Sequence, residues 1–353
     1  MKKLIIIGGG FAGSYCARKL ESHFDTVLID SKDYFEFTPS VLRTLVEPSH
    51  GKAIELQHVS YLKKARYVQG IVSKLEKGSG EQLVVDVSGT KIACDYVIIA
   101  TGSHYATPIK NERMVLANRS RELTQYSSHL SSAESVIIIG GGVVGVELAA
   151  EIACGYPDKK VILIHSGMQL CDRLPLRARE YITAFLLKKN VEIVFNERVK
   201  ESSGKVFSTV SGRHFTCDLA FWCTGIKASN ECLVNSPAFS SCVLLSGGIE
   251  VESTLQLKGQ VRCFVAGDVS AIVEEKLAQS AEAQAKVVVH NILALEKGEE
   301  LNLYTPQSRT MIISLGERDG VICSGSHVLC GLVAGLMKRS VEWVEMRKLR
   351  GWF

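Results

Sequence analysis

The chain has 353 residues, of which 46% are hydrophobic and 22% are charged, and its formal net charge is +4. This length and composition are typical of a globular protein with about two domains and a sizeable core. The small net charge argues against a nucleic-acid partner, which usually requires a strongly basic face, and we expect none.

The cysteines and the start of the chain bear on the cellular setting. Eleven cysteines form no C-x-x-C pair and no zinc-like spacing, so we expect reduced thiols, a cytoplasmic protein and no metal site. The chain runs from Met1, Lys2 and Lys3 directly into an apolar stretch. This start predicts no cleaved targeting peptide, and lysine at position 2 excludes N-myristoylation.

Residues 3–30 have the pattern of a dinucleotide-binding unit. An apolar strand leads into the turn G-x-G-x-x-G, a helical pattern follows, and a second strand ends in an acid. We expect Gly8 to permit the tight turn, Gly10 to admit a pyrophosphate and Gly13 to let helix and strand pack closely. The carboxylate of Asp30, at the end of the second strand, is placed to bind an adenosine ribose.

The same pattern recurs at residues 135–165, with Gly140, Gly142 and Gly145 in the turn. Two such units imply two dinucleotides, and the economical pair is a bound flavin and an exchanging nicotinamide. The second strand of this unit ends in His165, where an acid would favour NADH. NADH and NADPH therefore both remain open, and His165 is either a nucleotide contact or a surface residue.

Three shorter motifs agree with a chain built from two dinucleotide-binding units. Strands end in Ala-Thr-Gly at 96–102 and in Cys-Thr-Gly at 221–225, and Ala-Gly-Asp closes the stretch 261–268. With both turns, they resemble the flavin- and pyridine-nucleotide-dependent oxidoreductase superfamily over nearly the whole chain. The resemblance is strongest to ferroptosis suppressors of the apoptosis-inducing-factor-homologue group, followed by type II NADH:quinone dehydrogenases. The stretches that carry it are 33–39, 42–47, 145–151, 163–166 and 314–320.

The resemblance implies a set of cofactor contacts. Without a family role, Arg43 is a solvated charge near Glu47 and Val72 is ordinary strand core. By family position, the residues expected to contact FAD are Gly8, Gly9, Gly10, Phe11, Ala12, Arg43, Val72 and Asp268. The ends of the short motifs add Thr101, Gly102 and Gly225 to the expected cofactor contacts.

A missing cysteine pair bears on how electrons leave the flavin. Disulfide reductases of this superfamily place a C-x4-C pair shortly after the first unit to relay electrons to a thiol substrate. This chain has no cysteine between Cys16 and Cys94. We therefore expect direct transfer to an acceptor that reaches the flavin ring, which is a quinone, a small radical or oxygen. The resemblance favours a quinone.

The resemblance also implies catalytic residues. A glutamate at the position of Glu147 would orient the nicotinamide, although a carboxylate there also stabilises a helix N-terminus. The stretch 276–284 resembles the quinone-proximal helix of type II dehydrogenases, and Lys276 would stabilise a flavin or quinone anion. Gln279 stands where the vertebrate ferroptosis suppressor has a tyrosine, which leaves the acceptor's identity open. The alternative is an ordinary amphipathic helix.

The C-terminus has an apolar run at 328–337, followed by bases and aromatic residues. Ten apolar residues are too few to span a bilayer, but this composition suits the membrane-water interface. The alternative is a last strand and helix packed on the flavin domain. Lys338 lies where ferroptosis suppressors carry a lysine after their last apolar stretch, so the resemblance implies a role for it.

The predicted fold is α/β with two Rossmann-like domains. The FAD domain comprises residues 1–107 and 232–300, the NAD(P)H domain residues 108–231, and a C-terminal segment residues 301–353. The leading function is an FAD-dependent NAD(P)H:quinone oxidoreductase that pumps no protons, cytoplasmic and peripheral on a membrane. The rivals are a reductase of a protein or radical acceptor, of the ferredoxin or monodehydroascorbate type, and a redox-gated signalling protein. The oligomeric state is open.

Overall fold

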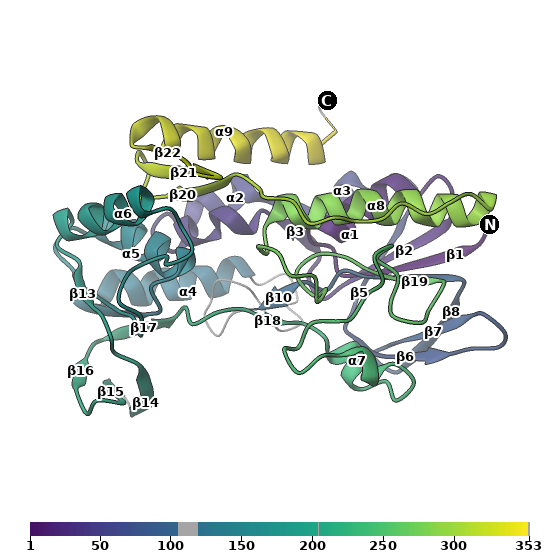
Figure 1. The fold of residues 1–353 in the computed structure, drawn as a ribbon, viewed down its shortest axis with the longest axis horizontal. Coiled ribbons are helices and arrows are strands. Elements are labelled where there is room, and N and C mark those ends of the chain that lie inside the picture. Colours follow the sequence, from purple (N-terminus) through teal and green to yellow (C-terminus); the bar gives the residue numbers. More distant parts are fainter. Residues whose placement is uncertain (105–118, 204, 352–353) are drawn as a thin grey trace.

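Two parallel sheets form the framework of this computed structural model, which describes residues 1–104, 119–203 and 205–351 (Figure 1). Helices accompany both sheets, so the predicted α/β class is confirmed. In the first sheet the order is β19 (Cys263–Val265), β9 (Tyr96–Ile99), β1 (Lys3–Ile7), β2 (Asp25–Asp30) and β5 (Arg66–Gln69). In the second it is β13 (Glu192–Val194), β12 (Lys160–Ile164), β11 (Ser135–Ile139) and β17 (Leu219–Trp222).

The central strands β1 and β11 are apolar because both faces of each sheet are covered. Residues 4–7 and 136–139 are at most 4% exposed, as expected for strands within a parallel sheet. The helix α1 (Phe11–Leu20) follows β1 and packs against α8 (Ala278–Lys297), which comes from much later in the chain. Since β19 also pairs with β9, distant segments complete the first sheet and its cover.

Smaller antiparallel sheets lie beside this framework. One comprises β6 (Val72–Lys77), β7 (Leu83–Val87) and β8 (Thr90–Cys94), and another comprises β14 (Val199–Ser203), β15 (Val206–Thr209) and β16 (His214–Thr216). The short strands β10 (Ser103–His104) and β18 (Lys227–Ala228) pair where the chain passes between the two units. A further pair is β3 (Tyr34–Glu36) with β4 (Glu55–Gln57).

Several of the helices contribute to one apolar core that unites three parts of the chain. Phe35, Leu42, Leu148 and Ile313 belong to the same buried cluster, although they come from distant segments. Before the C-terminal segment, the helices with residues in this cluster are η1 (Thr38–Leu45), α2 (Gly51–Ile54), α3 (His58–Tyr61), α4 (Arg119–Ser132), α5 (Val143–Gly155) and α6 (Leu176–Lys188). The short helices α7 (Glu231–Val234) and η3 (Ser240–Cys242) contribute to the core beside the first sheet, and η2 (Pro48–His50) has no buried residue.

The C-terminal segment forms a third layer of structure. Its antiparallel strands are β20 (Met311–Ser314), β21 (Gly320–Ser324) and β22 (His327–Cys330), and α9 (Leu332–Leu349) packs on all three and contacts α2. In Figure 1, α9 runs along the upper edge of the molecule. The predicted apolar run is thus divided between β22 and the start of α9. Across the described ranges, no helix has the length and apolar character needed to cross a membrane.

Candidate functional site

The first glycine turn has the geometry of a phosphate cradle. Gly8 has φ +97°, and a Cβ on Gly13 would lie 1.8 Å from the Gly8 carbonyl oxygen. A Cβ on Gly10 would meet no atom of the described residues within 4 Å, so open space lies in front of the turn. Helix α1 begins after Gly10 without a side-chain cap. Its free N–H groups are therefore available to an anion, as a bound pyrophosphate requires.

Asp30 lies directly against this turn. Its Oδ2 accepts a hydrogen bond from the Gly9 N–H at 2.5 Å, and its Oδ1 accepts one from the Lys32 N–H at 3.0 Å. Burial raises the pKa of Asp30, but nearby His58 and Lys32 outweigh that effect and bring it below its ordinary value. The carboxylate is thus ionised at neutral pH, as binding of ribose hydroxyls requires.

The second glycine turn repeats this geometry with an imidazole in place of the carboxylate. Gly140 has φ +116°, and a Cβ on Gly145 would lie 1.9 Å from the Gly140 carbonyl oxygen, while Gly142 faces open space. The Gly141 N–H donates to His165 Nδ1 at 3.1 Å. Burial lowers the pKa of His165, which keeps Nδ1 available as an acceptor. The half-buried His165 is therefore not a freely solvated surface residue.

A cavity of about 190 Å³ opens beside the second turn. Gly142 and Val143 line it from the turn and the first residue of α5, and Met311 and Cys323 line it from the C-terminal sheet. Residues 171–175 form another wall. This cavity thus joins the second glycine turn to the C-terminal segment.

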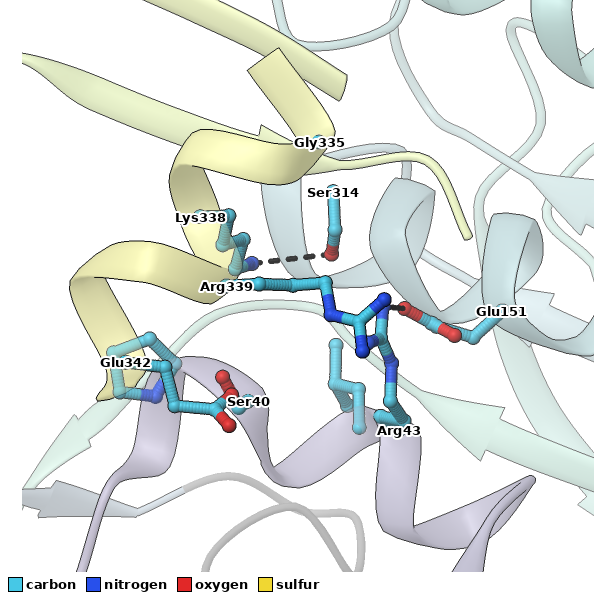
Figure 2. A pocket seen from close by; sticks show the side chains of 10 residues that line it. Ser40, Arg43, Glu151, Ser314, Gly335, Lys338, Arg339 and Glu342 are labelled. Atoms are coloured by element: carbon cyan, nitrogen blue, oxygen red, sulfur yellow. Dashed lines mark hydrogen bonds and ion pairs between the residues drawn. The ribbon is translucent and has the colours of Figure 1, made fainter. Parts of the chain in front are cut away.

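Two of the predicted catalytic residues, which are far apart in sequence, form an ion pair. Lys338 Nζ from α9 contacts the Glu147 carboxylate on α5, and both side chains are largely buried. The Ser314 N–H and Oγ–H also donate to Glu147, at 2.8 and 3.1 Å. Figure 2 shows Lys338 pointing toward Ser314. The C-terminal segment thus engages Glu147 directly, while its predicted contact with the nicotinamide stays a prediction.

Arg43 lines the same pocket as Lys338 (Figure 2). Its guanidinium donates to Glu151 at 3.3 Å and to the Gly316 carbonyl at 3.2 Å. Burial raises the pKa of Glu151, an effect that Arg43 opposes. The alternative of a solvated charge beside Glu47 is therefore wrong for Arg43, since its side chain is only 13% exposed. Its predicted contact with FAD remains a prediction.

Lys276 holds the loop before α8. Its Nζ donates to the carbonyls of Ser270 and Ile272 at 2.8 and 3.0 Å. Burial lowers the pKa of Lys276, against the opposing effect of Asp268 and Glu274. The positive charge that was predicted to face an acceptor is therefore tied to backbone carbonyls.

Gln279 lies exposed to solvent in the first turn of α8. The pattern that selected Gln279 also contains Gln284, whose part in the structure was not predicted. The Gln284 side chain is buried, accepts the Gly267 N–H at 2.7 Å and donates to Glu274 at 2.6 Å. Gln284 therefore fixes the loop that precedes α8.

Most of the remaining predicted contacts lie where the chain passes between the two units, and Val72 lies on β6. Asp268 accepts a hydrogen bond from Ser103 Oγ at 2.6 Å, and Thr101 Oγ1 donates to the Ser229 carbonyl at 2.6 Å. Gly102 and Gly225 have φ values of +72° and +119°. Val72 is buried at the start of β6. Two further residues have no predicted role: Ser314 begins the stretch 314–320 that resembles the family, and no motif surrounds His58.

Comparison with known proteins identifies the family. The profile described as pyridine nucleotide-disulphide oxidoreductase matches residues 2–285. The chain belongs to this family. Ferroptosis suppressor protein 1 of Taeniopygia guttata is 31% identical over 331 residues, which cover 90% of this chain and 87% of that protein.

Solved structures share the fold of this pyridine nucleotide-disulphide oxidoreductase. The sulfide:quinone oxidoreductase of Aquifex aeolicus has a TM-score of 0.81 at 18% identity and covers 99% of this chain and 92% of its own. NDH2 of Plasmodium falciparum, solved with NADH, has a TM-score of 0.80 at 13% identity and covers 99% and 97%. At these identities the likeness concerns the fold alone.

The buried pair of Glu147 and Lys338 generates a stability prediction for this oxidoreductase. Lys338→Met leaves the Glu147 charge buried without its cation, so we expect a loss of about 3–5 kcal/mol of unfolding free energy in urea titrations. The double variant with Glu147→Gln should lose clearly less than the sum of the single variants. Arg339→Met is the matched control, because its pair with Glu317 is exposed, and it should change little. Additive losses would contradict a direct interaction.

Proposed function

We propose that this protein is an FAD-dependent NAD(P)H:quinone oxidoreductase. The observation that carries the proposal is the presence of two glycine turns, each with open space in front of its third residue, at Gly10 and Gly142. Each turn leads into a helix without a side-chain cap. Two dinucleotides therefore fit, and FAD with an exchanging NAD(P)H is the pair that performs oxidoreductase chemistry.

The chain's residues would bind and orient these groups. Bound FAD would supply a carrier for two electrons between NAD(P)H, which would donate a hydride, and the acceptor. The α1 N–H groups would hold the FAD pyrophosphate and Asp30 its adenosine ribose. The cavity beside Gly142 would receive the nicotinamide nucleotide. The protein spans no membrane in this proposal and couples the reaction to no proton pumping.

A quinone is the acceptor that fits the remaining observations. The position of the missing cysteine pair is taken by Phe35, Phe37 and the apolar part of η1. No thiol relay is available there, so electrons would pass directly to a small acceptor. The resemblance to ferroptosis suppressors, one of which is 31% identical to this chain, favours a quinone among these acceptors.

Anaerobic stopped-flow spectroscopy tests this function. The flavin is first reduced with NADH or NADPH and then mixed with ubiquinone-1, and its absorbance is followed. We expect reduction by at least one nucleotide and rapid reoxidation by the quinone. If the reduced flavin persists in the presence of quinone, the acceptor is a protein or a radical and the quinone proposal is wrong. Absence of reduction by both nucleotides would contradict the nicotinamide assignment.

His165 provides a test of nucleotide preference. A carboxylate at this strand end would repel the 2′-phosphate of NADPH and bind the 2′-hydroxyl of NADH. We expect His165→Glu to raise the KM for NADPH roughly tenfold, equivalent to about 1.4 kcal/mol, with little change for NADH. His165→Gln is the control, since it introduces no charge. Equal changes for both nucleotides would show that His165 does not face the adenosine ribose.

We further propose that α9 contacts a membrane surface containing anionic lipids. Six apolar side chains on β22 and α9 are between 44% and 57% exposed. The far end of α9 carries bases, and the Arg347 guanidinium lies 3.8 Å from the Trp343 ring centroid. Such a face suits the interface at which a lipid-soluble quinone is met. The six apolar residues are Leu329, Leu332, Val333, Leu336, Met337 and Trp343.

Liposome sedimentation tests this contact. We expect Leu336→Asp to lower the fraction bound to anionic vesicles roughly tenfold, because a buried leucine contributes about 1.5–3 kcal/mol. Reduction of the water-soluble ubiquinone-1 should be unchanged. Leu245→Asp is the control, as Leu245 is fully exposed on the loop after η3. Unchanged vesicle binding by the Leu336 variant would reject the interfacial model.

A further inference from the structure

A buried histidine lies directly behind the first glycine turn. His58 is 0% exposed. A Cβ on Gly9 would lie 2.3 Å from His58 Cε1 and 2.7 Å from Asp30 Oδ2, so the ring and the carboxylate occupy the space behind this residue. Gly9 therefore has no side chain for a reason distinct from phosphate binding. His58 has no place in the predicted nucleotide motif.

The ring of His58 is held by two tyrosines and faces a carboxylate. Its Nδ1 lies 2.6 Å from the Tyr61 hydroxyl, and its ring centroid lies 5.1 Å from that of Tyr67. Its Nε2 lies 3.5 Å from Asp30 Oδ2, which is longer than an ordinary N–H···O hydrogen bond. Within the described ranges, Nε2 has no hydrogen-bond partner. This nitrogen is therefore a buried polar atom directed toward the turn.

The contact between Nδ1 and the Tyr61 hydroxyl fits a tautomer with the ring proton on Nε2. Burial and the charge of Asp30 raise the pKa of Tyr61, so its hydroxyl keeps a proton that it can donate to Nδ1. A neutral imidazole has one N–H group, which is then on Nε2 and points to Asp30. The titratable and charged groups around this network are Arg18, Asp30, Lys32, Asp33, Tyr61 and Tyr67.

The Asp30 carboxylate needs hydrogen-bond donors from the protein, because the residue is only 8% exposed and water cannot solvate it fully. A buried carboxylate is costly unless donors surround it. Its oxygens already accept N–H groups of Gly9 and Lys32, and His58 adds a donor from the protein interior. An ionised carboxylate has only acceptor atoms, which is what two ribose hydroxyls need.

We propose that His58 is a positioning residue for FAD, which holds the Asp30 carboxylate beneath the glycine turn so that it binds the adenosine ribose. His58 itself touches no part of the flavin ring in this arrangement. The inference rests on the proposal that the first unit holds FAD and is independent of the acceptor. It extends the cofactor site to a residue of α3 that lies outside every nucleotide-binding motif of the chain.

The rate of FAD release from the holoenzyme tests this role. Released FAD is followed by its fluorescence after dilution at pH 5 to 8. We expect His58→Phe to accelerate release about tenfold at pH 7.5, whereas His58→Gln, which keeps an N–H donor, should restore much of the retention. Because protonation of a carboxylate with a depressed pKa abolishes its contribution as the pH falls, release should accelerate at a higher pH in His58→Phe than in the wild type.

Three further variants make the test specific. Asp30→Asn should release FAD faster, and adding His58→Phe should change that rate no further, because His58 acts through Asp30. Tyr61→Phe removes the donor to Nδ1 and should accelerate release in the same direction, which keeps the test decisive if His58→Phe does not fold. Tyr67→Phe keeps its ring against His58 and should resemble the wild type.

The outcomes that overturn the inference are distinct from failure of the quinone reaction. Wild-type release rates in both His58→Phe and Tyr61→Phe would overturn it. An equal acceleration by His58→Phe in the wild-type and Asp30→Asn backgrounds would do the same, because His58 would then act independently of Asp30. A wild-type protein that retains no FAD would overturn both this inference and the proposed function, whereas a flavin that quinone leaves reduced would overturn only the latter.

Discussion

The close approach of each helix to its preceding strand is the constraint on which both nucleotide sites depend. At Gly13 and Gly145 a single added carbon would lie within 2 Å of a backbone carbonyl oxygen. Absence of side chains there lets α1 and α5 begin at the carboxyl ends of β1 and β11. The partial positive charge of each helix N-terminus is thereby directed at the open space before Gly10 and Gly142. The same steric requirement, a glycine where the helix meets the strand, thus creates a favourable position for an anion at each of the two turns.

A second set of interactions ties the C-terminal segment to these units. Glu147 and Glu151 lie one helical turn apart on α5, and their partners are Lys338 on α9 and Arg43 on η1. The first unit, the second unit and the C-terminal segment thus meet at two buried carboxylates of a single helix. Since each of these charges is largely shielded from water, each depends on a partner from another part of the chain. Buried charge pairing therefore joins the three parts where their apolar cores also meet.

The parts of this protein that sequence predicts are local. Each glycine turn is encoded with its strand and helix within about 20 consecutive residues. The α/β class and the roles of Gly8, Gly10 and Gly13 in the turn could therefore be predicted from the sequence. The contact of Glu147 with Lys338 spans 191 residues and depends on how α9 packs on β20, which no local pattern encodes. Lys276 was selected for its charge, but its carbonyl partners are set by the path of a loop. The alternative of a last strand and helix matches β22 and α9, and the apolar side chains predicted for an interface remain exposed beside them.

The late position of β19 has a consequence for synthesis of the chain. The four strands of the second sheet lie between residues 135 and 222, so this sheet can pair fully as soon as that stretch has left the ribosome. The first sheet begins at residue 3 but lacks its edge strand until residue 265 and the helix that covers α1 until residue 297. Domains generally fold as units during synthesis, the N-terminal one first. In this chain the second unit is complete before the first unit, although the first unit begins at the N-terminus. The N-terminal strands must wait for the unit inserted between them and their last partners.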